Sequence, residues 1–324
     1  MTWIMAMTSK IVAAGRLAES QGACRAPSTR YAGVVPQLLR LAAFTLDPSG
    51  GNPAGVWLGH ALPEPTEMLR IAAEVGYSET AFLAPDETGR PGHFRVRYFS
   101  SAAEVPFCGH ATIASGIALA ERSQPGRFLM TTNDGVVIVD VERRADRHLV
   151  AILTSVEPHV RDAAPELLAD TLAALDWKPT ELDPGLPPAV GYAGASHLII
   201  AAGSYERLAR LAYDFERLRS IMLAADLTTV QLVWRQSAEV FRARDPFPVG
   251  NVVEDPATGA AAAAMGAYLR WRGEIVPPAA FAIHQGVELG RPSLIEVEVP
   301  DATGGIRVSG TAVSLEGMDT SVPT

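Results

Sequence analysis

Three ionisable residues stand in sequence settings that suit proton transfer on a small molecule. Glu79 opens an otherwise apolar segment and has Tyr77 and Phe82 as near neighbours. An acid among apolar side chains is the setting in which a carboxyl can exchange protons near neutral pH. His110 and Asp255 each stand just before, or at the start of, a run of small residues. A carboxylate, an imidazole and a second carboxylate together favour general acid–base catalysis.

Two runs of small residues are expected to begin helices beside these groups, at Gly109–Ala111 and at Thr258–Ala260. A helix N-terminus presents unpaired backbone N–H groups and about half a positive charge. Small residues there allow an anion to approach closely. Two such helix starts facing each other would hold a substrate that carries a carboxylate.

Each of these signals also has a plain structural explanation. Glu79 could be an exposed strand end, His110 could cap its own helix, and Asp255, followed by a proline, could form a turn and an N-cap. Cys108 is better explained as a small buried hydrophobic residue than as a nucleophile, because no basic neighbour is visible in the sequence. The glycine-rich turn at Asn52 could be only a loop.

Other chemistries fit the sequence less well. It contains no G-x-S-x-G motif, no P-loop and no G-x-G-x-x-G motif after a strand. The seven histidines are scattered without metal-ligand spacing. Turns explain the acids at 245, 254 and 255 better than a divalent ion does. We therefore expect neither a metal nor a cofactor.

Hydrophobic periodicity and turn residues predict the elements that must position these groups. Thr66 is the expected N-cap of the first helix. Strands are expected at 39–45, 78–83, 94–99, 136–141, 148–153, 197–201, 229–234, 294–299 and 305–313, and helices at 65–75, 111–122, 164–174, 204–211 and 258–271.

One pattern recurs along the chain. Cys108–Thr112 leads into one alanine-rich helix, and Asp255–Gly259 leads into another about 147 positions later. Only a central, buried helix suits so many small residues. The spacing indicates two similar lobes, each with strands around a central helix, unless two alanine-rich helices coincide by chance.

Composition sets the broad class. The chain has 324 residues, 48% of them hydrophobic and 19% charged, with a net charge of −9. These values predict a folded protein of about two domains and argue against a dedicated nucleic-acid binder. Two cysteines cannot form a disulfide framework, and no apolar run is long enough for a membrane span. We expect a cytoplasmic protein, with residues 1–36 as a disordered or transit-peptide-like extension.

Five segments in order give the sequence a family resemblance. Together they resemble the phenazine-biosynthesis PhzF-like isomerase/epimerase family, which has the diaminopimelate-epimerase fold, from about Leu39 to Gly317. The segments are FTLDPSGGNPAGVWL (44–58), IAAEVGYSETAFL (71–83), RVRYFSSAAEVPFCGHATIAS (95–115), VEDPATGAAAAAMGAYL (253–269) and QGVELGRPS (285–293).

The resemblance implies an α+β fold of two pseudo-symmetric lobes, each a curled mixed β-sheet around a central helix, with the active site in the cleft between them. The first lobe would comprise residues 37–127 and about 307–324, and the second residues 128–306. The family also implies a homodimer.

The same resemblance assigns roles to residues. Glu79 matches the essential carboxylate, which removes a proton from carbon and returns it elsewhere without a cofactor. His110 and Asp255 match the site histidine and aspartate that hold the substrate's polar groups. The substrate-binding residues would be Asn52, Ser78, Gly109, Thr258, Gly259, Ala260, Gly286 and Arg291.

The chain departs from the family pattern at one of these positions. Members of the family usually have serine where this chain has Ala260. The missing hydroxyl removes one hydrogen bond, worth about 1 kcal/mol in a buried site. A substrate different from that of the phenazine pathway would explain the change. A catalytically silent carboxylate-binding or scaffold protein that keeps the fold is the alternative.

Overall fold

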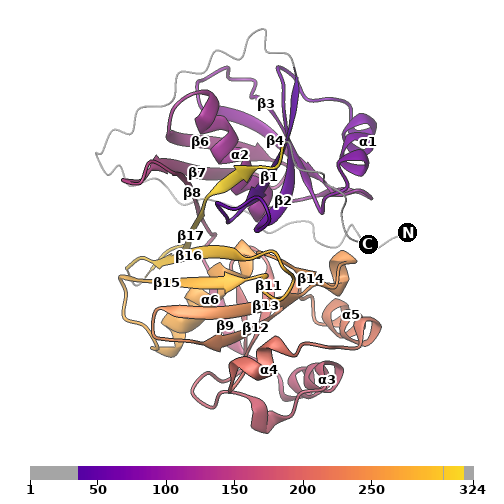
Figure 1. Ribbon diagram of the computed structural model, residues 1–324, viewed down its shortest axis with the longest axis vertical. Coiled ribbons are helices and arrows are strands. Elements are labelled where there is room, and N and C mark those ends of the chain that lie inside the picture. The colour runs from indigo at the N-terminus through magenta and orange to yellow at the C-terminus, as the bar shows by residue number, and fades with distance from the viewer. Residues whose placement is uncertain (1–35, 302, 317–324) are drawn as a thin grey trace. The chain divides into compact units, whose positions relative to one another are not determined.

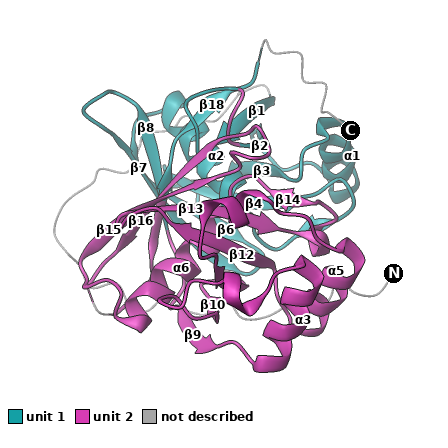
Figure 2. Ribbon diagram, turned by 60° about the horizontal axis from the view of Figure 1, so that its bottom comes forward, with its two compact units in different colours: residues 1–48, 52–153, 309–324 teal, residues 49–51, 154–308 magenta. Residues whose placement is uncertain are grey.

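The computed structural model describes residues 36–301 and 303–316. The expected N-terminal extension therefore lies outside the described residues, apart from Pro36. The described chain forms two compact units (Figure 2). Unit 1 comprises residues 36–48, 52–153 and 309–316, and unit 2 comprises residues 49–51, 154–301 and 303–308.

Unit 1 surrounds one long helix with strands (Figure 1). In the order in which they pair, its strands run β18–β1–β2–β3–β4–β6–β7–β8, and β5 pairs on β4. The elements are β1 Gln37–Ala43, β2 Asn52–Leu58, α1 Pro65–Val75, β3 Thr80–Pro85, β4 His93–Phe99, β5 Glu104–Val105, α2 Gly109–Arg122, β6 Gly126–Thr132, β7 Gly135–Arg143, β8 Leu149–Thr154 and β18 Ala312–Ser314.

Unit 2 has its own paired strands in the order β9–β10–β11–β12–β13–β15–β16, with β14 on β13. Strand β17 (Arg307–Gly310) lies where the chain passes from unit 2 to unit 1. The other elements are β9 His159–Asp162, α3 Pro165–Leu175, β10 Ala189–Tyr192, β11 Ser196–Ala201, α4 Tyr205–Ala209, α5 Phe215–Ala224, β12 Thr229–Arg235, β13 Val240–Pro246, β14 Glu254–Asp255, α6 Gly259–Arg272, β15 Ala279–Gln285 and β16 Ser293–Val299.

The two units repeat one pattern of strand directions. From β18 to β7 the successive pairings are antiparallel, antiparallel, parallel, antiparallel, parallel and antiparallel. From β9 to β16 the sequence of directions is the same. The recurrence of two alanine-rich helices in the sequence therefore corresponds to a repeated fold.

The central helices α2 and α6 are buried along most of their length. Residues 110–120 of α2 and 261–269 of α6 are all buried. Small residues stand where the sheet comes closest: a Cβ on Gly116 would lie 2.8 Å from a Val139 methyl group, and one on Gly266 would lie 2.9 Å from a methyl group of Ile306. The small residues thus predicted the position of both helices correctly.

The boundary between the units differs from the one expected at residues 127 and 128. Residues 128–153 belong to unit 1 because β6 pairs in parallel with β4, with His93 opposite Leu129. Strand β7 then pairs with β6 and packs against α2. This pairing of distant strands has no signal in the local sequence.

Helix α1 spans the residues expected for it, but its N-cap is Glu64 and not Thr66. Pro65 occupies the first helical position, where its fixed φ and missing N–H suit a helix start. The helix ends at Gly76, whose φ of 74° is left-handed. This turn sends the chain into β3 and places Glu79 directly before that strand.

Some elements carry no clear signal in the sequence. Helix α5 and strands β13 and β15 were not expected, and the strand expected over 305–313 is divided into β17 and β18. Among the described residues, no helix is both long and apolar enough to cross a membrane.

Candidate active site

In unit 1 a carboxylate, a thiol and an imidazole lie together at the start of α2. Cys108 Sγ lies 3.5 Å from Glu79 Oε2, and His110 Nε2 also lies 3.5 Å from that oxygen. The sulfur is 3.4 Å from His110 Nδ1 and 3.7 Å from Nε2. The side chains of His110 and Glu79 are 7% and 16% exposed. The three groups are therefore close together and nearly enclosed. Of the two ionisable side chains, Glu79 is more accessible than His110.

Backbone and side-chain hydrogen bonds hold this cluster in place. Thr112 Oγ1 donates to the Cys108 carbonyl at 2.6 Å, and therefore Tyr98 donates to Thr112 Oγ1 across 2.7 Å. Tyr98 is buried, and this burial raises the pKa of its phenol well above the usual value. The phenol therefore remains a donor. On the other side, the Glu79 carbonyl accepts from Gly55 N–H at 3.1 Å.

Of the remaining unit 1 residues expected in the site, Ser78 and Gly109 lie in the segments that hold the cluster, whereas Asn52 lies on another strand. Ser78 Oγ is 3.4 Å from His110 Nε2. Gly109 begins α2, so the sequence signal at Gly109–Ala111 falls on the first turn of the helix. His110 does not cap α2, because Cys108 occupies the N-cap position. Asn52 is buried at the start of β2, opposite Ala43 of β1.

In unit 2 a second group of side chains forms around the start of α6. Thr258 Oγ1 donates to Asp255 Oδ2 at 2.6 Å. Gln285 Nε2 donates to the Asp255 carbonyl at 2.7 Å and contacts Thr258 Oγ1 at 3.0 Å. Gln285 Oε1 accepts from Thr258 N–H at 3.2 Å. Gln285 is fully buried and had not been singled out from the sequence, although it stands directly before Gly286.

These contacts leave the first turn of α6 without a side-chain cap. Thr258 is the N-cap residue, but its hydroxyl makes no cap hydrogen bond. The hydroxyl donates to Asp255 and accepts from Gln285 instead. Residues 259–261 therefore present backbone N–H groups that no N-cap side chain satisfies, which favours an anion at this helix start.

Gly286 and Arg291 shape the loop beside this group. Gly286 has a φ of 73°, and a Cβ there would lie 2.4 Å from the Arg291 carbonyl and 2.7 Å from the Pro256 carbonyl. The Arg291 guanidinium donates to the Gly51 carbonyl at 2.8 Å and to the Gly50 carbonyl at 2.5 Å. Both residues thus hold backbone segments at the site.

A buried polar row continues from Asp255 into the sheet of unit 2. Asp245 on β13 pairs with Asp255 on β14. Its Oδ1 accepts from Thr229 Oγ1 at 2.9 Å, and that hydroxyl contacts His197 Nδ1 at 2.8 Å. The hydroxyl hydrogen is directed to Asp245, so His197 Nδ1 carries a proton and donates it. Asp245 Oδ2 and His197 Nε2 have no hydrogen-bond partner among the described residues.

Burial shifts the pKa values of Asp245 and His197, the two ends of this row. Asp245 is fully buried, and the loss of hydration raises its pKa well above the usual value, with Asp255 and Glu254 adding to the effect. Burial also lowers the pKa of His197 to about 3. His197 is therefore neutral near neutral pH, and Asp245 keeps its proton to a higher pH than an exposed aspartate does. The sequence could not show this arrangement, because His197, Thr229 and Asp245 come from three different strands.

The two units align residue by residue around their central helices. Tyr98 faces Val105 across β4 and β5, as Asp245 faces Asp255 across β13 and β14. In each unit the arginine before this position forms a bidentate pair with a glutamate: Arg97 with Glu104, and Arg244 with Glu254. In the strands, the register matches Glu79 with Thr229 and Tyr98 with Asp245. At the helix starts, the matched positions are Cys108 and Thr258, Gly109 and Gly259, and His110 and Ala260.

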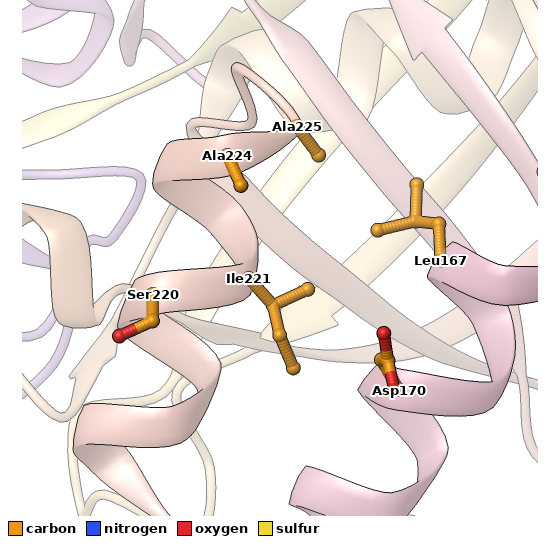
Figure 3. Close-up of a pocket in the computed structure, with 6 residues that line it drawn as sticks. All are labelled: Leu167, Asp170, Ser220, Ile221, Ala224 and Ala225. Carbon is orange, nitrogen blue, oxygen red and sulfur yellow. The ribbon is translucent and has the colours of Figure 1, made fainter.

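A surface hollow of unit 2 lies away from both groups. Figure 3 shows it between α3 and α5, with a volume of about 360 Å³. Its lining is mainly apolar, with Ser220 and Asp170 as the polar side chains. A single carboxylate without a basic or nucleophilic neighbour in the lining offers no catalytic arrangement.

The structure thus joins the predicted site residues in two groups, one in each unit. Cys108 is buried, as the sequence favoured, but it also contacts both ionisable residues of its group. Asp255 does not lie in a turn: it ends the two-residue strand β14, and its carboxylate accepts from the Thr258 hydroxyl.

Comparison with known proteins places these features in a family. The model of the family described as phenazine biosynthesis-like protein matches residues 41–317. The uncharacterized isomerase YfhB of Bacillus subtilis is 30% identical over 291 residues, covering 86% of this chain and 97% of YfhB. The trans-2,3-dihydro-3-hydroxyanthranilate isomerase of Pseudomonas fluorescens is 28% identical over 275 residues, covering 84% and 94%.

Solved structures agree with this assignment at the level of the fold. The Bacillus anthracis phenazine biosynthesis protein of the PhzF family superposes with a TM-score of 0.76 at 24% identity, covering 87% of this chain and 97% of that one. The expected fold class, an α+β fold of the diaminopimelate-epimerase type, is confirmed. The matched family model and the named relatives lead to one conclusion: the chain is an isomerase that belongs to the phenazine biosynthesis-like protein family.

Proposed function

We propose that this isomerase moves a proton on a small substrate that carries a carboxylate, with Glu79 as general base and then general acid. The observation that supports the proposal most is the setting of the Glu79 carboxylate. It lies at the start of α2, 3.5 Å from His110 Nε2, and its side chain keeps 16% of its surface exposed. The oxygen is thus held by neighbours and still open to a small molecule.

The proton transfer would proceed in two steps on one carboxylate. Glu79 takes a proton from a carbon made acidic by an adjacent carboxylate, enamine or alkene, and the electron pair shifts along the substrate. Protonated Glu79 then returns the proton to a different carbon. The substrate's own π system carries the electron pair, so the step needs no cofactor. His110 would donate to the oxygen or nitrogen on which charge develops.

The group in unit 2 has the chemistry to bind an amino or hydroxy acid. A carboxylate would accept from the uncapped N–H groups of residues 259–261 at the start of α6. Asp255, oriented by the Thr258 hydroxyl at 2.6 Å, would accept from a substrate amino or hydroxyl group. The Pseudomonas fluorescens relative is named for an anthranilate, which is an amino carboxylate, and this supports the substrate class.

Proton exchange in deuterated water tests the proposal. The protein is incubated with trans-2,3-dihydro-3-hydroxyanthranilate and a panel of small amino and hydroxy acids, and deuterium is located by NMR. We expect deuterium at one carbon of one substrate. Glu79→Gln should lower the exchange rate by about 10²- to 10⁴-fold, since it removes the general base.

Glu121→Gln is the matched control, because Glu121 is an exposed glutamate in the last turn of α2. It should exchange at the wild-type rate. Exchange that survives in Glu79→Gln would assign the base to another residue. Binding of a panel acid without any exchange would support the silent carboxylate-binding protein that Ala260 favours.

A further inference from the structure

The three donor atoms of the unit 1 cluster are spaced like ligands on one metal ion. We propose that Glu79, Cys108 and His110 form a three-ligand site for a divalent cation of the zinc class. Their nearest donor atoms all lie within 4.8 Å of one another. The Sγ–Oε2, Nε2–Oε2 and Sγ–Nε2 distances are 3.5, 3.5 and 3.7 Å.

Tetrahedral zinc requires nearly these separations. With bonds of about 2.3 Å to sulfur and about 2.0–2.2 Å to nitrogen and oxygen, a tetrahedron has ligand-to-ligand edges of about 3.3–3.7 Å. The three atoms therefore have the separations of one face of the tetrahedron. Because Sγ lies at nearly equal distances from both ring nitrogens, 3.4 and 3.7 Å, binding an ion also requires side-chain rotation that turns a ring nitrogen and the sulfur toward it.

The scaffold of the cluster holds these ligands in advance. Cys108 and His110 lie two residues apart at the start of α2, which Tyr98 and Thr112 fix through the Cys108 carbonyl. Glu79 comes from the segment before β3, anchored by Gly55 N–H. Two elements thus supply a carboxylate, a thiol and an imidazole, and the fourth position is left for water or another small ligand.

The ligand set selects the metal. A thiolate with an imidazole suits zinc or cobalt(II), whereas magnesium and calcium prefer oxygen ligands. Binding replaces the thiol proton, which is released to water as the zinc–sulfur bond forms. The matched positions of unit 2, Thr258 and Ala260, have neither a thiol nor an imidazole. We therefore expect one ion per chain, in unit 1.

The ion would act as an inhibitor and not as a cofactor, and this part of the inference rests on the proposed function. An oxygen of Glu79 bonded to zinc cannot accept a proton from carbon. Cys108, which the proton transfer does not need, would then make the enzyme sensitive to zinc.

Cobalt(II) spectroscopy tests the site without any substrate. The full chain carrying Cys24→Ser, so that Cys108 is its only thiol, is freed of metal with a chelator and titrated with cobalt(II). We expect a thiolate-to-cobalt charge-transfer band and intense tetrahedral ligand-field bands that saturate at one equivalent. Zinc should bleach both. Loss of the charge-transfer band is expected in Cys108→Ala, and of the tetrahedral bands in His110→Ala.

His93→Ala is the matched control, because His93 lies in unit 1 beside a carboxylate, 3.6 Å from Asp86, but has no thiol neighbour. It should give the full cobalt spectrum. Saturation without a thiolate band, or an unchanged spectrum in Cys108→Ala, would overturn the proposal.

A second measurement uses the unaltered cluster. Zinc should protect Cys108 from alkylation by iodoacetamide, read by peptide mass spectrometry, and magnesium should not; equal alkylation with and without zinc counts against the site. The two proposals fail separately. Cobalt bands without deuterium exchange would refute only the proposed reaction, and exchange that zinc leaves unchanged, without cobalt bands, would refute only the metal site.

Discussion

The two units share a scaffold and differ in the chemistry placed on it. In each, a bidentate arginine–glutamate pair fixes a two-residue strand, and the chain then turns through a proline into an alanine-rich helix. At the helix start, unit 1 has Cys108 and His110 where unit 2 has Thr258 and Ala260. The scaffold therefore supplies a helix start in both units, and a few side chains decide which chemical groups surround it.

The difference extends into the cores. The position of Tyr98 in unit 1 is taken by Asp245 in unit 2, so a buried phenol is replaced by a carboxyl whose pKa burial raises. The arginine–glutamate pair is also more deeply buried in unit 2. Its side chains are 9% and 1% exposed, against 20% and 27% in unit 1. The ion pair beside the start of α6, where unit 2 has Thr258 and Ala260, is thus more deeply buried than the pair beside the start of α2.

The largest expected effect comes from breaking the two ion pairs. Arg244→Met leaves Glu254 buried and unpaired, although desolvation already raises its pKa, and should lower the free energy of unfolding by about 3–5 kcal/mol. Arg97→Met removes a partly exposed pair and should cost about 1 kcal/mol or less. Urea unfolding measures both. Equal losses would show that burial does not distinguish the pairs.

The next effect concerns two glycines with left-handed φ. Gly286→Ala would drive a Cβ against the Arg291 and Pro256 carbonyls, and we expect a loss of about 3 kcal/mol in the free energy of unfolding. Gly76→Ala has the same backbone strain but nothing within 4 Å of the new Cβ, and should cost about 1 kcal/mol. Thermal unfolding compares them. A similar loss of stability at both positions would show that the left-handed φ alone causes it and that the clash at Gly286 adds nothing.

The shifted pKa values of His197 and Asp245 in unit 2 should make the free energy of unfolding depend on pH. A histidine whose folded pKa lies below the unfolded value of about 6.5 loses stability as pH falls through 6.5. A carboxyl whose folded pKa is raised loses stability as pH rises above about 3.9. His197 and Asp245 therefore give the free energy of unfolding opposite slopes with pH.

Single variants should separate the two contributions. Asp245→Asn leaves His197 alone, so the free energy of unfolding should fall by about 2 kcal/mol from pH 6.5 to pH 5 relative to wild type. His197→Asn should show the opposite slope. His148→Asn, at an exposed position of unit 1, is the control and should follow wild type. Parallel pH profiles for all four proteins would mean that folding shifts the pKa of neither His197 nor Asp245.

The smallest effect is expected from a substitution that makes the start of α6 more polar and thus more like the start of α2. Ala260→Ser adds a hydroxyl in the first turn of α6, where the family usually has serine, and should lower KM for the natural carboxylate substrate by up to about tenfold. Ala280→Ser, on an exposed position of β15, should leave kinetics unchanged. A higher KM in Ala260→Ser would indicate a substrate that needs an apolar contact at this position.

How much of this could be predicted depends on whether the signal is local. The limits of α1, the small-residue helices and the acid before β3 all follow from neighbouring residues, and the family resemblance assigned their roles. The contact of Cys108 with Glu79 joins residues 29 positions apart, and Asp245, Thr229 and His197 meet only through the register of three strands. The allocation of residues 128–153 failed for the same reason, because a parallel pairing decides it.

One pairing in unit 1 also constrains how the protein is made. Strand β18 pairs with β1, so residues 312–314 complete a sheet that begins at residue 37. Domains generally fold in the order of their synthesis. In this chain all of unit 2 is translated before the last strand of unit 1. The part of the protein that carries Glu79 is therefore the last to be closed, and the edge of β1 must be kept from other partners until β18 has been made.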